Sequence, residues 1–286
     1  MKVTMPFGLS IISLFIHFLS YAQSAKTETI VWKDIMPDKT SPAQSIELAI
    51  PSNGSLISGV LYKANGNKPH PTLILFHGLP GNEKSLDIAQ VVRNHGWNVI
   101  FFNYRGSWGS QGEFSFKNCV DDGANVLMYA KQNSGLLQID TSNIALFGHS
   151  MGGLVCLKLL QQLPDLKKGI VVSAMSVPTV LSGSDGRTLS SRAIDIEKMF
   201  VLKIKSGKDF YAPFITDSSY FDLSKDTKPF SHKQLVMLDE NSKNKLLADA
   251  IRKNNASLDY EVWQTDHPFT NKRVELIKKI ILLLDQ

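Results

Sequence analysis

Short, continuous runs of apolar residues recur through the middle of the chain. They cover residues 72–76, 98–102, 143–147 and 169–173, each with a single polar residue at one end. Strands that are covered on both faces are continuously apolar, whereas strands with one wet face alternate. These runs therefore predict buried strands of a parallel sheet, with further strands at 234–238 and 258–263.

Helical patterns alternate with these runs, and a hairpin precedes them. The predicted helices cover residues 85–95, 121–132, 151–163 and 271–284. The hairpin joins 45–50 to 56–62 through the turn signal Pro51-Ser52-Asn53-Gly54. Strand–helix alternation of this length predicts an α/β protein with a doubly wound, mostly parallel sheet.

About 60 residues between the strands at 169–173 and 234–238 break this alternation. A connection of that length should carry structure of its own, and residues 192–203 have a helical pattern. The segment at about 176–232 is therefore interpreted as a small cap inserted over the end of the sheet. We expect this cap, together with the aromatic strip at 114–116, to set the choice of substrate.

The first 22 residues have the order of a secretory signal peptide. Lys2 is followed by an apolar run at 7–19 and by small residues up to Ala22. The run is shorter than the roughly 20 residues that span a bilayer, although an uncleaved anchor is the alternative. We expect an exported, periplasmic or extracellular protein with a mature domain at 23–286 and no stable membrane span.

Composition excludes several other classes. The net charge of +5 is scattered along 286 residues, so binding to nucleic acid is not expected. Two cysteines cannot build a disulfide scaffold, and the apolar surroundings of Cys156 predict a buried free thiol. No structural zinc site, other metal or cofactor is expected.

The motif Gly148-His149-Ser150-Met151-Gly152-Gly153 lies between a predicted strand and a predicted helix. This is the context of a Gly-x-Ser-x-Gly nucleophile elbow, in which a sharp turn exposes the serine at the end of the sheet. The glycines remove β-carbons that would collide in the turn. Ser150 is the predicted nucleophile, and the backbone N–H of Met151 is predicted to bind the oxyanion.

A second motif, His77-Gly78-Leu79-Pro80-Gly81, follows the strand at 72–76. An oxyanion hole takes its other donor from this position, and Leu79 is the candidate. His77 is expected to shape the loop rather than to carry protons. The glycine spacing does not match that of a phosphate-binding loop.

His267, in Thr265-Asp266-His267-Pro268-Phe269, is the predicted general base, because acid and histidine follow the serine in chain order. The acid is ambiguous. Asp239 is preferred over the alternative Glu240 because it comes first after the strand and has the stiffer side chain. Asp185 is a third option, and Asp266 would have to fold back onto the base.

These motifs, with the stretch from Tyr104 to Gly112, resemble the α/β-hydrolase superfamily from about residue 45 to the C-terminus, less the cap. The resemblance implies the α/β-hydrolase fold and acyl-hydrolase chemistry. One departure is that the usual Gly-x-x-Asp context of the acid is absent. A simple alignment places Ser242 at the position where the family carries its acid.

The predicted function is a serine hydrolase that cleaves carboxylic esters, acting on a small-molecule ester or a short peptide. The first alternative is a peptidase or amidase, because the His-Gly-x-Pro-Gly loop is similar to that of serine aminopeptidases. The second is a non-catalytic binding protein on the same scaffold, which the intact Ser150 and His267 disfavour.

Overall fold

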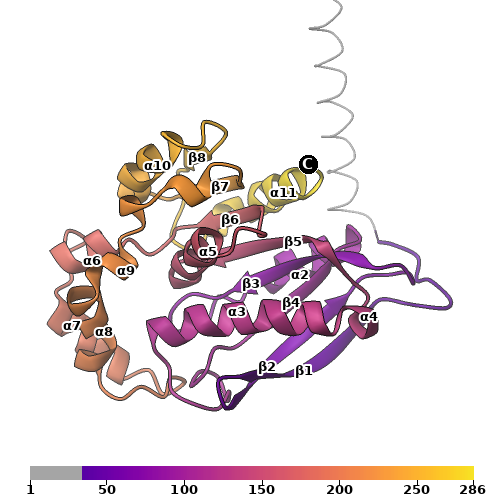
Figure 1. Ribbon diagram of the computed structural model, residues 1–286, viewed down its shortest axis with the longest axis horizontal. Coiled ribbons are helices and arrows are strands. Elements are labelled where there is room, and N and C mark those ends of the chain that lie inside the picture. Colours follow the sequence, from indigo (N-terminus) through magenta and orange to yellow (C-terminus); the bar gives the residue numbers. More distant parts are fainter. Residues whose placement is uncertain (1–33) are drawn as a thin grey trace, which may run out of the picture.

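The computed structural model describes residues 34–286, so the predicted signal segment lies outside the described residues (Figure 1). The strands are β1 (Gln44–Ser52), β2 (Ser55–Lys63), β3 (His70–Phe76), β4 (Asn98–Phe102), β5 (Ile139–His149), β6 (Lys168–Val172), β7 (Gln234–Asp239) and β8 (Asp259–Val262). The helices are α2 (Leu86–Asn94), α3 (Phe116–Gln132), α4 (Ser134–Leu137), α5 (Met151–Gln162), α6 (Val177–Ser182), α7 (Leu189–Glu197), α8 (Gly207–Thr216), α9 (Ser218–Phe221), α10 (Lys245–Arg252) and α11 (Arg273–Leu284). Four 3-10 turns complete the described elements: η1 (Leu223–Lys225), η2 (Lys228–Phe230), η3 (Ser242–Asn244) and η4 (Thr270–Lys272).

The strands form one eight-stranded sheet in the order β1-β2-β4-β3-β5-β6-β7-β8. β2 is antiparallel to both of its neighbours, and every other pair, from β4 to β8, is parallel. The predicted fold class, a mostly parallel doubly wound sheet that opens with a hairpin, is confirmed.

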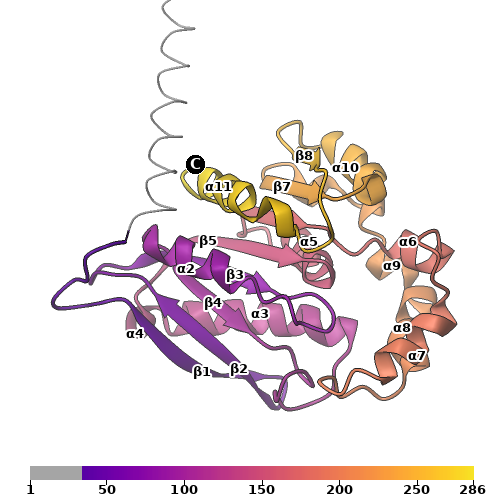
Figure 2. The same ribbon diagram turned by 180° about the vertical axis from the view of Figure 1, so that it is seen from behind.

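Each face of the sheet carries its own apolar core. Side chains of β3 alternate between the two cores, with Ile74 and Phe76 in one and Leu73 and Leu75 in the other. The first core includes α3 and α5, and the second includes α2 and α11 (Figure 2). Coverage of both faces explains why the strand runs are continuously apolar.

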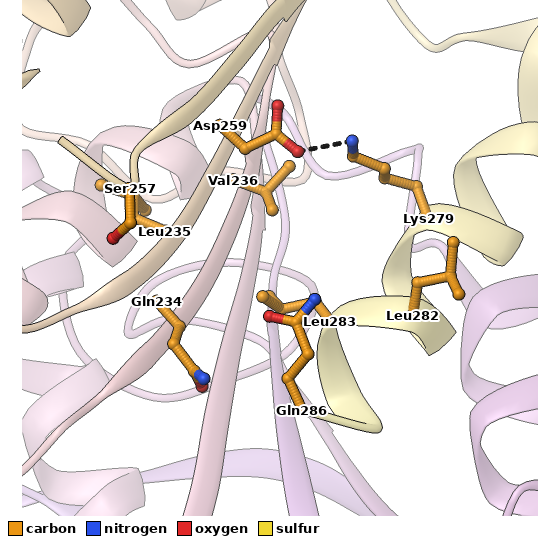
Figure 3. A pocket seen from close by; sticks show the side chains of 9 residues that line it. All are labelled: Gln234, Leu235, Val236, Ser257, Asp259, Lys279, Leu282, Leu283 and Gln286. Atoms are coloured by element: carbon orange, nitrogen blue, oxygen red, sulfur yellow. Dashed lines mark ion pairs between the residues drawn. The ribbon is translucent and has the colours of Figure 1, made fainter. Parts of the chain in front are cut away.

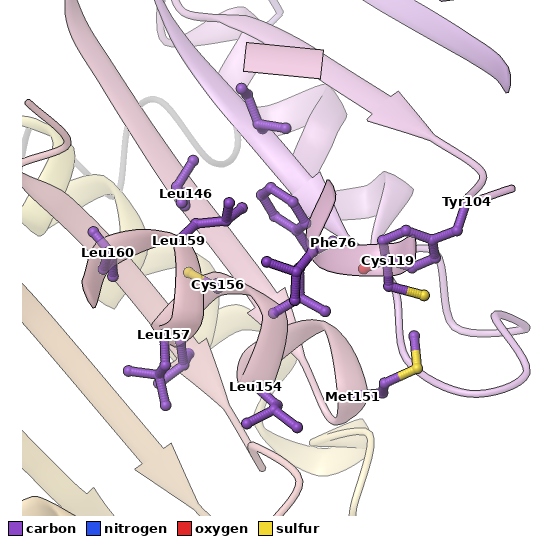
Figure 4. Packing of buried hydrophobic residues seen from close by; sticks show 14 of the residues in the cluster. Phe76, Tyr104, Cys119, Leu146, Met151, Leu154, Cys156, Leu157, Leu159 and Leu160 are labelled. Atoms are coloured by element: carbon purple, nitrogen blue, oxygen red, sulfur yellow. The ribbon is translucent and has the colours of Figure 1, made fainter. Parts of the chain in front are cut away.

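Helix α5, which follows the elbow, is apolar on nearly every side. All residues from 151 to 160 are buried, including the charged Lys158. Figure 4 shows side chains such as Leu146 and Phe76 around this helix, with Cys119 and Met151 near its beginning. A helix with no wet face must lie inside the protein, so the position of α5 is strongly constrained.

The predicted boundaries differ from the structure chiefly at α3. This helix begins at Phe116 rather than at residue 121, because the side chain of Ser115 accepts a hydrogen bond from the backbone N–H of Asn118 and caps the N-terminus. The short helix α4 and the helix α10 were not predicted.

The segment between β6 and β7, residues 176–232, holds α6 to α9 and two 3-10 turns. Its first three helices stand beside the main layers in both views (Figures 1 and 2). An antiparallel bridge between Ser107 and Leu202 ties it to the loop after β4. We call residues 176–232 the inserted segment.

The aromatic strip at 114–116 does not line the active-site cavity described below, which corrects that expectation. Phe114 and Phe116 are buried, and both rings pack against Phe210 of α8, with Phe214 also on Phe116. These residues join the inserted segment to the body of the protein through an aromatic core.

Candidate active site

Ser150 stands in a sharp turn between β5 and α5. Its φ of 57° and ψ of −119° lie outside the regions that most residues adopt. A β-carbon at Gly148 would lie 2.3 Å from the carbonyl oxygen of Gly152, and one at Gly152 would lie 2.0 Å from that of Phe76. Only glycine fits at both positions, as expected for a nucleophile elbow.

The side chains of Ser150, His267 and Glu240 form a chain of hydrogen bonds. His267 Nε2 lies 3.1 Å from Ser150 Oγ, and His267 Nδ1 lies 2.9 Å from Glu240 Oε1. The imidazole is about half exposed, whereas the carboxylate side chain is 14% exposed. A neutral imidazole with Nδ1–H on the carboxylate presents an unprotonated Nε2 to the serine hydroxyl.

Two further side chains fix Glu240. Ser173, which directly follows β6, donates its hydroxyl to Oε2 at 2.6 Å, and Lys243 Nζ lies 2.9 Å from Oε1. Burial opposes ionisation, but the hydrogen bonds from His267, Lys243 and Ser173 outweigh it and hold the pKa of Glu240 well below its usual range. Glu240 is therefore a carboxylate at any pH at which the protein would work. Neither Ser173 nor Lys243 was identified from the sequence.

Asp239 does not reach the base, and the preference for it is corrected. Its carboxylate is buried and accepts hydrogen bonds from the backbone and side chain of Asn244 and from the hydroxyl of Tyr260. Burial raises its pKa. Asp239 thus stabilises the turn that presents Glu240, the alternative named from the sequence.

The other two candidate acids also have different partners. Asp185 binds the guanidinium of Arg192 in the inserted segment. Asp266 accepts a hydrogen bond from the backbone N–H of Thr270 and stabilises the turn after the base. Neither hydrogen bonds to His267 in the structure.

Comparisons with known proteins agree with this architecture. Residues 71–191 match the sequence model described as the alpha/beta hydrolase fold. An esterase from Pyrobaculum calidifontis superposes with a TM-score of 0.63 at 13% identity, over 92% of this chain and 90% of that one. The chain has the α/β-hydrolase fold. A second structure, ferulic acid bound to Est1E from Butyrivibrio proteoclasticus, has a TM-score of 0.62 at 16% identity over 82% and 98% of the two chains.

Among curated proteins, the homologues of this chain include cutinases. Cutinase 1 of Thermobifida cellulosilytica is 27% identical over 142 residues, which are 46% of this chain and 53% of the relative. Cutinase est2 of Thermobifida alba is 24% identical over 177 residues, or 58% and 55% of the two chains. The chain therefore spans about half the length of these relatives.

A cavity of about 650 Å³ lies next to the serine. Ser150, Glu240 and His267 line it together with Leu79 and several residues of the inserted segment. Met151 is the first residue of α5, so its N–H has no acceptor within the helix. Leu79 and Met151 thus flank the serine from the two positions predicted for oxyanion donors.

Two more histidines lie close to the elbow. His149 Nε2 is 3.0 Å from the carbonyl oxygen of His267, and burial lowers its pKa to about 4. His77 Nδ1 is 2.7 Å from the carbonyl oxygen of Gly78, and burial likewise lowers its pKa to about 4. Both are neutral near pH 7 and brace backbone segments of the site, in agreement with a structural role for His77.

A second cavity, of about 470 Å³, lies at the opposite ends of the strands, beside β7 and β8. Its residues come from the beginnings of β7 and β8 and from the end of α11, and an ion pair between Asp259 and Lys279 crosses one side (Figure 3). Its nine lining residues include no histidine or cysteine. The cavity at Ser150, which holds the hydrogen-bonded serine, histidine and glutamate, is therefore the candidate active site.

Cys119 and Cys156 are buried and free, which confirms the prediction for Cys156. Within residues 34–286, no group of three or more His, Cys, Asp or Glu is placed to hold a metal ion. In the same residues, no helix has the length and apolarity to cross a membrane.

Proposed function

We propose that this protein hydrolyses carboxylic esters through an acyl-enzyme on Ser150. The observation that carries the proposal is the hydrogen-bonded series Ser150–His267–Glu240 at the wall of a cavity whose volume, about 650 Å³, is large enough for a small ester. The cutinases among its relatives and the esterases with the same fold support an ester over other acyl compounds.

In the first half of the reaction, Ser150 Oγ attacks the ester carbonyl carbon while His267 Nε2 takes the hydroxyl proton. The carbonyl π electrons move to oxygen, and the backbone N–H groups of Leu79 and Met151 donate to the resulting oxyanion. When the tetrahedral intermediate collapses, the bond to the alcohol oxygen breaks. His267 returns the proton to that oxygen, and the alcohol leaves.

In the second half, water attacks the acyl carbon and gives its proton to His267. The intermediate then releases the carboxylic acid, and Ser150 recovers its proton. Throughout, Glu240 holds Nδ1–H of His267 and stabilises the imidazolium, without itself taking the proton. Ser173 and Lys243 position Glu240 for this task.

A fluorophosphonate probe and an ester panel test the proposal. The protein should be labelled at Ser150 and should hydrolyse nitrophenyl acetate, butyrate or octanoate faster than the matching aminoacyl nitroanilides. Ser150→Ala should abolish labelling and lower kcat by on the order of 10⁴ or more. Ser142→Ala, at the far end of the same strand and exposed, is the matched control.

Three outcomes would overturn the proposal. Labelling at another serine would move the nucleophile, and faster cleavage of the amides would make the protein a peptidase or amidase. Absence of both labelling and turnover would indicate a binding protein on this scaffold.

We further propose that the protein is exported, with cleavage after Ala22. The charged, apolar and small-residue order of residues 1–22 supports this proposal.

A further inference from the structure

The inserted segment places positive charge in the wall of the active-site cavity. Arg187 and Arg192 line it, and Lys243 lines it from beyond β7. The acidic lining residues are Asp185 and Glu240. Three cations against two anions leave the wall with a net charge of +1 while His267 is neutral. An apolar acyl group does not require such a wall.

Arg192, on α7, is the most deeply buried of the three cations. The residue is 7% exposed, and only its Nη2 contacts Asp185, reaching both carboxylate oxygens. Its Nε is buried without a hydrogen-bond partner. None of the hydrogen bonds among the described residues engages Nη1.

A guanidinium has five N–H donors, so this arrangement leaves binding capacity unsatisfied. A buried donor without an acceptor destabilises the protein, and a charged acceptor relieves that cost most strongly. The Asp185 side chain is 40% exposed, so the pair is accessible to solvent from the carboxylate side. Arg187, whose Nη2 lies 2.8 Å from Asp195, adds a second positive charge to the same wall.

We propose that Arg192 and Arg187 form an anion subsite, so that the protein prefers esters that carry a carboxylate, such as monoesters of dicarboxylic acids. The proposal rests on the proposed function, because it names the substrate class of the same cavity. The carboxylate binds Arg192 at Nη1, the amino group that Asp185 leaves free, while the ester carbonyl lies at Ser150.

Matched pairs of charged and neutral esters test the preference and show whether the carboxylate is recognised on the acyl side or on the alcohol side of the ester. Nitrophenyl hemiglutarate should have a kcat/KM at least about tenfold above that of its methyl ester, if the charge belongs on the acyl side. The butyrate ester of 4-hydroxybenzoate, compared with that of methyl 4-hydroxybenzoate, tests the alcohol side. The preference should shrink as salt is raised. Equal rates in both pairs would overturn the proposal.

Variants that remove a positive or a negative charge from the cavity wall should have opposite effects, which separates charge recognition from structural damage. Arg192→Gln should lower the ratio of anionic to neutral kcat/KM by roughly tenfold, and Arg192→Lys should restore part of it. Asp185→Asn should raise the same ratio, because it removes the competing carboxylate. Lys225→Gln makes the same charge change in the inserted segment outside the cavity wall and is the control. A purely structural role of the pair would lower both substrates together and leave the ratio unchanged.

A binding measurement keeps the test independent of turnover. In Ser150→Ala protein, calorimetry should detect glutarate binding at least about tenfold tighter than that of neutral glutaramide, and Arg192→Gln should remove the difference. Equal binding of the two, or none of either, would refute the anion subsite. Failure of the proposed function would instead appear as wild-type protein that is neither labelled nor active on any ester.

Discussion

Replacing Glu240 by Gln removes one negative charge beside the base while nearly preserving the shape of the side chain. The glutamine oxygen can still accept the hydrogen bond from His267 Nδ1, which lies 2.9 Å from Glu240 Oε1. The imidazolium that forms during the reaction loses its counter-charge. The substitution therefore acts on the transition state rather than on the resting geometry.

The structure sets the size of this effect. Charges about 4 Å apart interact by about 4 kcal/mol at an effective dielectric constant of about 20, which corresponds to about 10³ in rate. The ammonium of Lys243, 2.9 Å from the same oxygen, already offsets part of the negative charge that His267 experiences. We therefore expect Glu240→Gln to lower kcat by about 10²–10³.

Asp239→Asn is the matched comparison, because the two carboxylates are adjacent in the chain. Asp239 holds Asn244 and Tyr260 rather than the base, so its replacement should reduce kcat by less than about tenfold and lower the thermal midpoint instead. Nitrophenyl butyrate turnover and thermal unfolding of both variants are the measurements. If a folded Asp239→Asn protein loses more activity than Glu240→Gln, the assignment of the acid is wrong.

Three other predictions follow from packing, burial and the N-terminal sequence. Gly152→Ala should destabilise the fold by about 3 kcal/mol or more, because its β-carbon would lie 2.0 Å from a carbonyl oxygen of β3. The β-carbon of the control, Gly135→Ala, meets nothing within 4 Å, so this variant should unfold at nearly the wild-type temperature. Burial lowers the pKa of His77 and of His149 to about 4, so the unfolded state takes up protons before the folded state as the pH falls. The free energy of unfolding should therefore decrease between about pH 6.5 and pH 4, by up to about 3 kcal/mol for each histidine. Urea titrations at several pH values check this, and a flat profile for wild type, or one that His77→Asn leaves equally steep, contradicts it. N-terminal sequencing of the mature protein should begin at residue 23, and an intact Met1 on soluble cytoplasmic protein would exclude export.

The sheet was predictable because its two cores impose the same pattern on every central strand. Ile74 and Phe76 face one core and Leu73 and Leu75 the other, so no polar residue interrupts the run. The nucleophile was predictable for a related reason, since its turn accepts only glycine at Gly148 and Gly152. Steric rules of this kind act over a few residues and can be read from one sequence.

The preference for Asp239 as the acid was wrong, because the alternation of side chains along β7 continues through residues 239 and 240 and distinguishes between them. Leu235 and Met237 face the core that contains α5, whereas Val236 and Leu238 face the core that contains α11. Asp239 continues the first set, and Glu240 is in step with the second. His267 lies two residues before Phe269, which also belongs to the second core. Side-chain alternation, rather than closeness to the strand or stiffness, would have selected Glu240.

Ser173, Lys243 and Arg192 could not be found in this way, because their roles depend on contacts between distant segments. Ser173 and Glu240 are 67 residues apart and meet only because β6 and β7 are neighbours in the sheet. Arg192 reaches the cavity from an insertion whose helices have no counterpart in the strand–helix alternation. The reaction type thus follows from local turns that sequence motifs encode, whereas charge selection in the cavity follows from long-range packing. A close relative with the same elbow but without Arg192 should therefore share the chemistry and lose the preference for anionic esters.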